Sequence, residues 1–206
     1  MGRDKIISRA RDVLRIEAEG IENVAQNLDD NFKNAVQIIY SCKGKVVITG
    51  MGKGGIVGTK IARTFASTGT PALTLHPGDA IHGDVGVVTE NDVVLAISNS
   101  GETEEVLRII PLIRRIGASV ISMTGNISSS LARMSDVVLN TGVKREACPM
   151  GIIPTASTTA TLALGDALAM VLLDKRGFKM DDYALYHPGG ELGKRLKART
   201  SEDGKG

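Results

Sequence analysis

The chain has 206 residues, with 25 Lys or Arg, 23 Asp or Glu and a formal net charge of +2. This length suits one domain with a proper hydrophobic core, and the charge gives no general excess to neutralise a nucleic-acid backbone. The hydrophobic share of 42% and the charged share of 23% exclude wholesale disorder. Glycine is the outlier: its 24 residues make about 12% of the chain, against a usual share of about 7%.

The sequence also predicts a compartment. The longest apolar stretch of note, residues 167–173, is bounded by Asp166 and Asp174 and is far shorter than the ~20 residues that span a bilayer. The charged N-terminus is not followed by the apolar segment of a secretory signal. Cys42 and Cys148 have neither metal-site nor redox spacing. We therefore expect a cytoplasmic protein without membrane contact.

The first forty residues have helical periodicity. Apolar residues between positions 21 and 39 recur at intervals of three or four, which predicts an amphipathic helix. Residues 6–16 predict a second helical piece, and Gly20 is the expected break between the two.

Short β-branched runs begin after Lys45 and predict strands that are buried on both faces of a sheet. They occupy residues 46–49, 72–75, 93–97, 120–123 and 137–139. Helical patterns follow most of them, at residues 56–67, 103–116, 128–134 and 155–175. A short closing helix is expected after His187-Pro188-Gly189-Gly190, and residues 201–206 are expected to form a disordered tail.

Strands that alternate with helices predict an α/β fold, here a three-layer α-β-α sandwich around a five-stranded parallel sheet with extra N-terminal helices. We expect a single domain over residues 1–200, with N-terminal helices in 1–43 and the α/β core in 44–200. In such sheets ligands bind beyond the carboxyl ends of the strands, where the strand order reverses. The loops that follow the strands are therefore the candidate functional segments.

The loop after the first strand, Gly50-Met51-Gly52-Lys53-Gly54-Gly55, satisfies the pattern G-x-G-x-x-G. A dinucleotide site would also need an acidic residue at the end of the second strand, but Asp79 lies beyond the following turn. A P-loop is excluded because Lys53 is followed by Gly54 rather than by Ser or Thr. A tight strand–helix turn with an exposed lysine is the plain alternative.

The loop after the third strand combines three hydroxyls, from Ser98, Ser100 and Thr103, with a glycine and the start of a helix. Free backbone N–H groups, the helix dipole and hydroxyl donors together describe an anion site. An ordinary N-cap is the alternative, but a cap needs only one hydroxyl. We favour binding of one small phosphate monoester, because no basic cluster lies nearby.

Other polar residues follow strands as well. His76 and His82 lie in a turn-rich stretch, where they could border a ligand site, bind a metal or be capped turn residues. Glu146 follows the fifth strand and is either a general base or a solvated acid paired with Arg145. His187 precedes a Pro-Gly-Gly turn, where a lone histidine is usually structural.

Five motifs in chain order resemble those of a known family: Gly50-Met51-Gly52-Lys53, Ser98-Asn99-Ser100-Gly101-Glu102, Glu146-Ala147-Cys148-Pro149, Ala156-Ser157-Thr158-Thr159 and His187-Pro188-Gly189-Gly190. Together they resemble the sugar isomerase (SIS) domain, and in particular its D-arabinose 5-phosphate isomerase branch. Gly54 departs from that pattern, which commonly has Ser there. Many members of the family continue into a pair of CBS domains, so this chain resembles the short form or a piece of a longer protein.

The resemblance implies an activity: the interconversion of D-ribulose 5-phosphate and D-arabinose 5-phosphate through a cis-enediol, which supplies Kdo for lipopolysaccharide biosynthesis. It implies no required cofactor, and a zinc ion at His76 would inhibit rather than assist. The catalytic residues carried over from the family are Lys53, Glu105, Glu146 and His187. The implied substrate-binding residues are Gly52, Gly69, Thr70, His76, His82, Ser98, Ser100, Thr103, Ser157 and Thr158.

The resemblance also implies a homotetramer whose sites are shared between subunits, which fits the long separation of His187 from the hydroxyl loop and the apolar stripe of the N-terminal helices. Three alternatives stay open. One is a SIS isomerase for a hexulose or heptose phosphate, and another is a dehydrogenase. The third is a non-catalytic sensor of a sugar phosphate or sugar nucleotide, although the N-terminal helices lack a basic recognition face.

Overall fold

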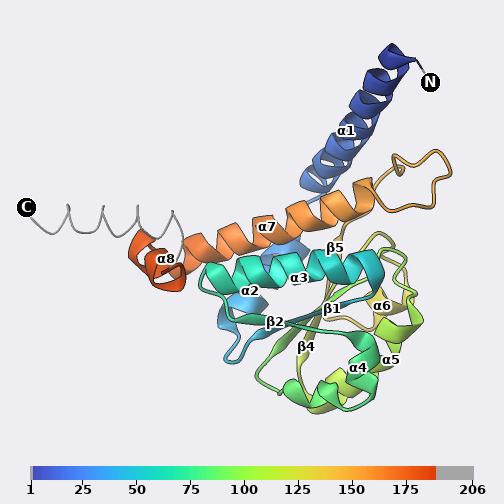
Figure 1. The fold of residues 1–206 in the computed structure, drawn as a ribbon. Helices are drawn as coiled ribbons and strands as arrows, with labels where there is room; N and C mark the ends of the chain where they lie inside the picture. Colours follow the sequence, from blue (N-terminus) through green and yellow to red (C-terminus); the bar gives the residue numbers. More distant parts are fainter. Residues whose placement is uncertain (1, 189–206) are drawn as a thin grey trace, which may run out of the picture.

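A computed structural model describes residues 2–188, and Figure 1 shows its fold. The closing helix expected after His187-Pro188-Gly189-Gly190 and the tail expected at 201–206 lie outside the described residues.

The centre of the domain is a five-stranded parallel sheet with the strand order β2-β1-β3-β4-β5. The strands are β1 (Val46–Gly50), β2 (Ala72–Leu75), β3 (Val93–Ile97), β4 (Ser119–Thr124) and β5 (Val137–Asn140). β1 lies between β2 and β3, and its Val46 pairs with Ala72 of β2 and with Val93 of β3. All residues of β1 and β3 are buried, as the continuous apolar runs predict.

Helices cover both faces of the sheet and complete the expected three layers (Figure 1). Side chains alternate across each strand, so Ile48 and Leu95 pack on one face and Val47 and Val94 on the other. The first face carries α2 (Asp30–Ser41), α3 (Gly52–Ser67) and α7 (Ala156–Arg176). The second carries α4 (Pro77–Ile81), α5 (Glu104–Ile116) and α6 (Ser130–Arg133), and the 3₁₀ helix η1 (Asp84–Val87) follows α4.

The predicted break at Gly20 is wrong, because α1 (Arg3–Gln26) runs through that position without interruption. Gly20 is instead buried where α1 crosses the rest of the domain: a Cβ there would lie 3.1 Å from Val143 Cγ1 and 3.5 Å from Ala156 Cβ. The glycine therefore serves close packing rather than a turn. The real break follows Asn27, and Asp29 caps α2 by accepting a hydrogen bond from the backbone N–H of Asn31 at 2.9 Å.

Two helices were not expected from the sequence, α4 and α8 (Met180–Tyr186). They have five and seven residues, which is too short for a helical repeat of apolar positions to appear. α3 also begins at Gly52, four residues before the predicted start at 56. The predicted start is late because the first turn of this helix is rich in glycine, which is typical of a loop. The predicted end of α7 is close, since Gly177 terminates this helix.

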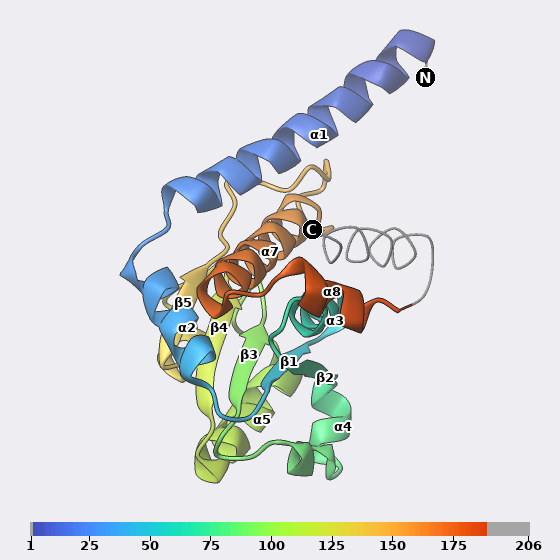
Figure 2. The ribbon, with the colours of Figure 1, turned by 90° about the vertical axis from the view of Figure 1, so that its left-hand side faces the viewer.

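α7 is long and apolar enough to cross a membrane by length and composition. Half of its most apolar window is buried inside the domain, where Ala160, Leu164 and Leu168 belong to the core beneath the sheet. It packs between α1 and α3, as Figure 2 shows. Burial of this kind is typical of the central helix of an α/β domain.

Candidate active site

The strand order places a crevice between β1 and β3. β2 lies on one side of β1 and β3 on the other, so the connections leave the carboxyl ends of β1 and β3 in opposite directions and open a gap there. A pocket of about 330 Å³ occupies this position. It is lined by the β1–α3 loop, the β3–α5 loop and the first turns of α7: Met51, Lys53, Gly54, Val57, Ile97, Ser98, Asn99, Ser100, Thr103, Pro154, Ser157, Thr158 and Thr161.

The loop between β3 and α5 is held in one shape by its own hydroxyls. Ser98 Oγ and Thr103 Oγ1 lie 2.7 Å apart, and the backbone N–H of Gly101 donates to Ser98 Oγ at 3.1 Å. Gly101 has φ +68°, and a Cβ at this position would lie 2.0 Å from Ser129 Oγ. Only glycine fits a backbone that turns this tightly against the next loop.

Thr103 occupies the N-cap position of α5, yet its hydroxyl makes no capping hydrogen bond. The N–H groups of the first turn of α5 are therefore not satisfied by their own cap. This geometry favours the anion site over the ordinary N-cap, because Thr103 lines the pocket and an uncapped helix N-terminus attracts negative charge.

Lys53 lies in the first turn of α3 and is exposed at the wall of the pocket. Within residues 2–188 no acidic side chain forms an ion pair with its ammonium group. A lysine placed in this way offers its charge to a ligand rather than to the protein.

Ser157 supplies a second reason to expect a ligand. Its side chain is almost fully buried, with 1% exposure, and its Oγ makes no hydrogen bond of ordinary geometry among the described residues, although it lies near enough to Glu146 to lower the pKa of that carboxyl. Buried hydroxyls nearly always have a partner. Ser157 lines the pocket, so a bound ligand can supply the missing hydrogen bond.

Glu146 lies beside the first turn of α7. Its Oε2 accepts hydrogen bonds from Thr155 N at 2.8 Å, Thr155 Oγ1 at 2.9 Å and Ser157 N at 3.3 Å. Burial raises the pKa of Glu146, but the hydrogen bonds from Ser157 and Thr155 outweigh it and hold that pKa below its ordinary value. The alternative of an ion pair with Arg145 is wrong, because Arg145 lies 3.8 Å from Glu19 instead.

Several residues carried over by resemblance lie away from the pocket. Thr70 Oγ1 accepts a hydrogen bond from Arg176 Nε at 3.1 Å, at the far end of α7. The 21 residues of α7 span about 30 Å, so Thr70 and the neighbouring Gly69 are far from the pocket at the other end. His187 follows α8, where its ring stacks on Tyr183 with centroids 3.9 Å apart.

The remaining carried-over residues lie nearer to the loops. Gly52 adjoins Lys53 in the first turn of α3, and Glu105 is half-buried in the first turn of α5 behind Thr103. His76 and His82 flank α4 and are exposed. None of these four lines the pocket in one chain.

The surroundings of His76 do not by themselves make a zinc site. Its Nδ1 lies 3.7 Å from Asp79 Oδ2, which gives two candidate ligands. In the part of the chain that the structure describes, no group of three His, Cys, Asp or Glu side chains is placed to hold a metal ion. A closed zinc site uses four ligands.

Besides the apolar Val57 and Ile97, sequence reasoning missed two polar residues of the site. Thr161 lines the pocket one helical turn after Ser157, a spacing of four that could have been found on α7. Thr155 holds the carboxylate of Glu146, but nothing in the sequence indicates that contact.

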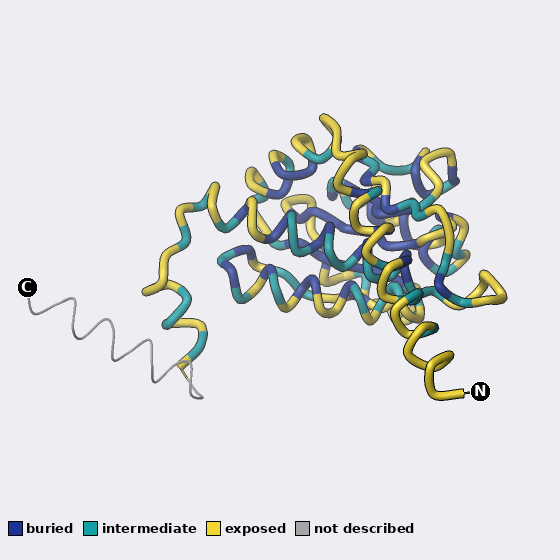
Figure 3. The backbone as a smooth tube through the Cα atoms, turned by 90° about the horizontal axis from the view of Figure 1, so that it is seen from above, coloured by how far each residue is buried: buried dark blue, intermediate teal, exposed yellow. Residues whose placement is uncertain are grey.

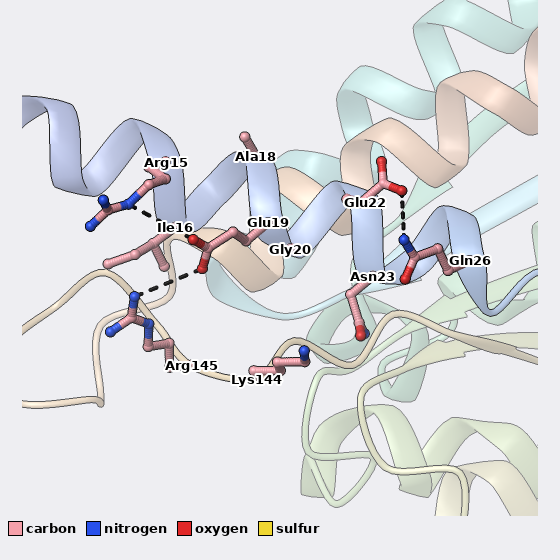
Figure 4. A pocket seen from close by; sticks show the side chains of 10 residues that line it. All are labelled: Arg15, Ile16, Ala18, Glu19, Gly20, Glu22, Asn23, Gln26, Lys144 and Arg145. Carbon is pink, nitrogen blue, oxygen red and sulfur yellow. Dashed lines mark hydrogen bonds and ion pairs between the residues drawn. The ribbon is translucent and has the colours of Figure 1, made fainter.

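A larger hollow of about 520 Å³ lies between α1 and the loop at Lys144 and Arg145 (Figure 4). Its charged groups largely satisfy one another: Glu19 lies 3.8 Å from both Arg15 and Arg145. It contains no hydroxyl cluster and no helix N-terminus. We therefore assign the chemistry to the smaller pocket.

The fold and the site define an α/β protein with a pocket at the switch point of its sheet, lined by hydroxyls and a lysine, and with the carboxylate of Glu146 in an adjoining hollow. Comparison with protein families matches residues 38–171 to the SIS domain, and the chain belongs to this family. The resemblance drawn from the five sequence motifs and the α/β fold predicted from alternating strands and helices are both confirmed.

Curated relatives agree with this family. The chain is 52% identical over 192 residues to arabinose 5-phosphate isomerase KdsD of Yersinia pestis, covering 93% of this chain and 58% of that protein. It is 48% identical over 196 residues to KdsD of Pseudomonas aeruginosa, covering 95% and 60%. The chain thus spans less than two thirds of the length of these relatives. The solved structure of Escherichia coli CFT073 c3406 in complex with arabinose 5-phosphate matches with a TM-score of 0.89 and 41% identity, over 91% of this chain and 100% of that chain.

Proposed function

We propose that this chain is an aldose–ketose isomerase that interconverts D-ribulose 5-phosphate and D-arabinose 5-phosphate. The observation that carries the proposal is the crevice between β1 and β3, which brings the hydroxyl loop, Lys53 and the buried Ser157 to one pocket. The names of the KdsD relatives and the arabinose 5-phosphate complex of c3406 support this substrate over other phosphosugars.

The hydroxyl loop and the first turn of α5 bind the phosphate. Ser98, Ser100 and Thr103 line the pocket next to the uncapped N-terminus of α5. Backbone amides, hydroxyls and a helix dipole suffice for one small dianion. This arrangement agrees with the near-zero net charge of the chain.

Isomerisation moves one proton between C1 and C2. A base removes the proton from the carbon next to the carbonyl, the electron pair forms the double bond of a cis-enediolate, and the proton returns to the neighbouring carbon. Glu146 is the proposed base, because hydrogen bonds to Oε2 keep its carboxylate ionised. Lys53 stabilises the negative charge that develops on oxygen. Glu105 and His187 are further acid–base candidates.

The proposed reaction needs no redox cofactor, since no net oxidation occurs. Zinc at His76 is proposed only as an inhibitor, and its binding would need ligands beyond His76 and Asp79. We further propose a cytoplasmic enzyme that supplies arabinose 5-phosphate for Kdo and lipopolysaccharide biosynthesis, in keeping with the KdsD relatives.

Incubation with ribulose 5-phosphate in deuterated water tests the activity. We expect a new aldose with deuterium at C2, because a carboxylate base exchanges its proton with solvent between the two transfers. NMR follows the product, and hexulose and heptose phosphates serve as competing substrates. Absence of the aldose would contradict the proposal, and faster turnover of a hexulose or heptose phosphate would favour the alternative isomerase.

We also propose a homotetramer whose sites are shared between subunits. The N-terminal half of α1 projects from the domain and is exposed (Figures 2 and 3), and its apolar residues Ile6, Ile7 and Leu14 are at least half exposed. Ile152 in the loop before α7 is 74% exposed. A second copy that covers these surfaces can also bring its own His187 to the pocket, which this chain's His187 does not line.

Sedimentation at micromolar concentration tests the assembly. We expect four times the chain mass of 21.7 kDa, and a smaller assembly for Leu14→Glu because a charge on α1 opposes burial of that face. Leu112→Glu is the matched control, since Leu112 is an exposed leucine on α5. A wild-type protein with the mass of one chain would contradict the proposed tetramer.

A further inference from the structure

The carboxylate of Glu146 is held from one side only. All three of its hydrogen bonds end on Oε2, from Thr155 N at 2.8 Å, Thr155 Oγ1 at 2.9 Å and Ser157 N at 3.3 Å. Within residues 2–188 no hydrogen bond reaches Oε1. One oxygen is therefore anchored and the other is left to accept a proton.

Thr155 connects this carboxylate to the backbone that carries it. Its Oγ1 accepts a hydrogen bond from the N–H of Ala147 at 2.8 Å. A hydroxyl has a single proton to donate, so that proton points to Glu146 Oε2. The side chain of Thr155 thus bridges the backbone N–H of Ala147 and the carboxylate of Glu146.

We propose that Thr155 is a positioning residue, which fixes the carboxylate of Glu146 through Oε2 and leaves Oε1 as the oxygen that takes the proton. Glu146 itself lines the hollow next to Arg145 and Cys148, and its contact with Ser157 N connects that hollow to the pocket. This inference rests on the proposed function, because it assigns Glu146 the proton transfer. Thr155 does not line the pocket and has no direct part in binding the substrate.

The charged neighbours of Glu146 are engaged elsewhere. Arg9 of α1 and Arg145 line the same hollow as Glu146, but Arg9 donates to the carbonyl of Ala147 and Arg145 lies 3.8 Å from Glu19. Cys148 also lines it, and a hydrogen bond from the backbone of Ile153 is the main cause that lowers the pKa of its thiol. On α7, Thr159 bonds to Glu17. The donors that hold the carboxylate are therefore those of Thr155 and Ser157.

The test compares three variants for turnover and its pH profile. Thr155→Val keeps the shape but removes the hydroxyl, and we expect kcat to fall about 10- to 100-fold from misplacement of Glu146 while KM stays within about twofold. The acid limb of kcat should move to higher pH, since a carboxylate that loses a donor is protonated more easily. Thr155→Ser keeps the hydroxyl and should behave as the wild type.

Thr159→Val is the matched control, because Thr159 lies on the same helix and donates to a carboxylate, Glu17, at 3.0 Å. It should leave the pH profile unchanged. Cys148→Ser is combined with each variant, so that ionisation of the Cys148 thiol cannot contribute to the pH dependence of kcat. If Thr155→Val does not fold, Thr155→Ala takes its place. An unchanged acid limb in the folded variant, or a rise in KM alone, would overturn the inference.

A second measurement does not depend on activity. Titration of ¹³C-labelled glutamate carboxyls by NMR, with Glu146 assigned through Glu146→Gln, should show a higher pKa for Glu146 in Thr155→Val than in the wild type. An equal pKa would overturn the inference even if the enzyme is active. Lack of isomerisation by the wild type would instead contradict the proposed function, and the titration would still decide whether Thr155 holds Glu146.

Discussion

Replacement of Glu146 by glutamine should lower kcat by about 10²- to 10⁴-fold, the usual contribution of a general base. The fold should survive, because the three donors around Oε2 can bond to the amide oxygen of glutamine instead. The amide nitrogen then takes the place of Oε1 and cannot accept a proton. Steady-state kinetics with ribulose 5-phosphate, together with circular dichroism, measures both effects.

Glu19→Gln is the control for this substitution, since Glu19 is an acid on α1 that pairs with Arg15 and Arg145 outside the pocket. It should retain wild-type kcat. Near-wild-type turnover by Glu146→Gln would transfer the role of base to Glu105 or His187.

The pH profile of the wild type follows from the same contacts. Because the folded-state pKa of Glu146 lies below its ordinary value of 4.5, the carboxylate stays ionised at neutral pH. Activity that depends on Glu146 as a base is therefore fully present above pH 4.5 and is lost as the pH falls through the lowered pKa.

Replacement of Asp92 by alanine should lower the free energy of unfolding by about 3 kcal/mol, the scale for removing one member of a buried, hydrogen-bonded ion pair. The side chain of Asp92 is 1% exposed. It joins the starts of β1 and β3 by accepting from Lys45 N at 2.7 Å, Lys45 Nζ at 2.8 Å and Thr89 N at 2.8 Å. Alanine leaves these donors without their acceptor. Urea unfolding followed by circular dichroism measures the loss.

Asp92 lies at the amino end of the sheet, opposite the pocket, so folded Asp92→Ala should keep wild-type kcat. Asp84→Ala is the matched control, because Asp84 is an exposed acid on η1 and should change the free energy of unfolding by less than about 0.5 kcal/mol. An Asp92→Ala protein as stable as that control would contradict the proposed role.

The contribution of Asp92 to stability also depends on pH. Burial raises the pKa of Asp92, but hydrogen bonds from Lys45 and Thr89 lower it by more, so the folded-state value lies below the ordinary 3.8. Its stabilisation is therefore fully present above about pH 3.8 and is lost as the pH falls through the lowered pKa. Acid unfolding should show a smaller pH dependence in Asp92→Ala.

The sheet was predictable because its signal is local. β2 and β3 have the predicted bounds. β3 is buried along its whole length, as its continuous apolar run predicts. The prediction of burial on both faces is wrong for the edge strands β2 and β5, which have a neighbouring strand on one side only and are partly exposed. The hydroxyl loop was predictable for a similar reason, because all its hydroxyls lie within six residues. Its place in the pocket follows from the rule that loops after parallel strands meet at one edge.

Other features depend on residues that only the fold brings together. The role of Gly20 depends on Val143 and Ala156, more than 120 residues away, so sequence periodicity alone suggested a break that does not exist. The distance of Thr70 from the pocket depends on the length and direction of α7.

By itself, the amino-acid sequence therefore determined the α/β sheet, the family and the two loops that border the site. Only the tertiary structure decided that Glu146 bonds to Thr155 rather than pairing with Arg145, and that the side chain of Ser157 is buried beside the pocket. The physical reason is that apolar periodicity records how deeply each segment is buried. A hydrogen bond, in contrast, depends on the direction of two groups that meet only after the chain has folded.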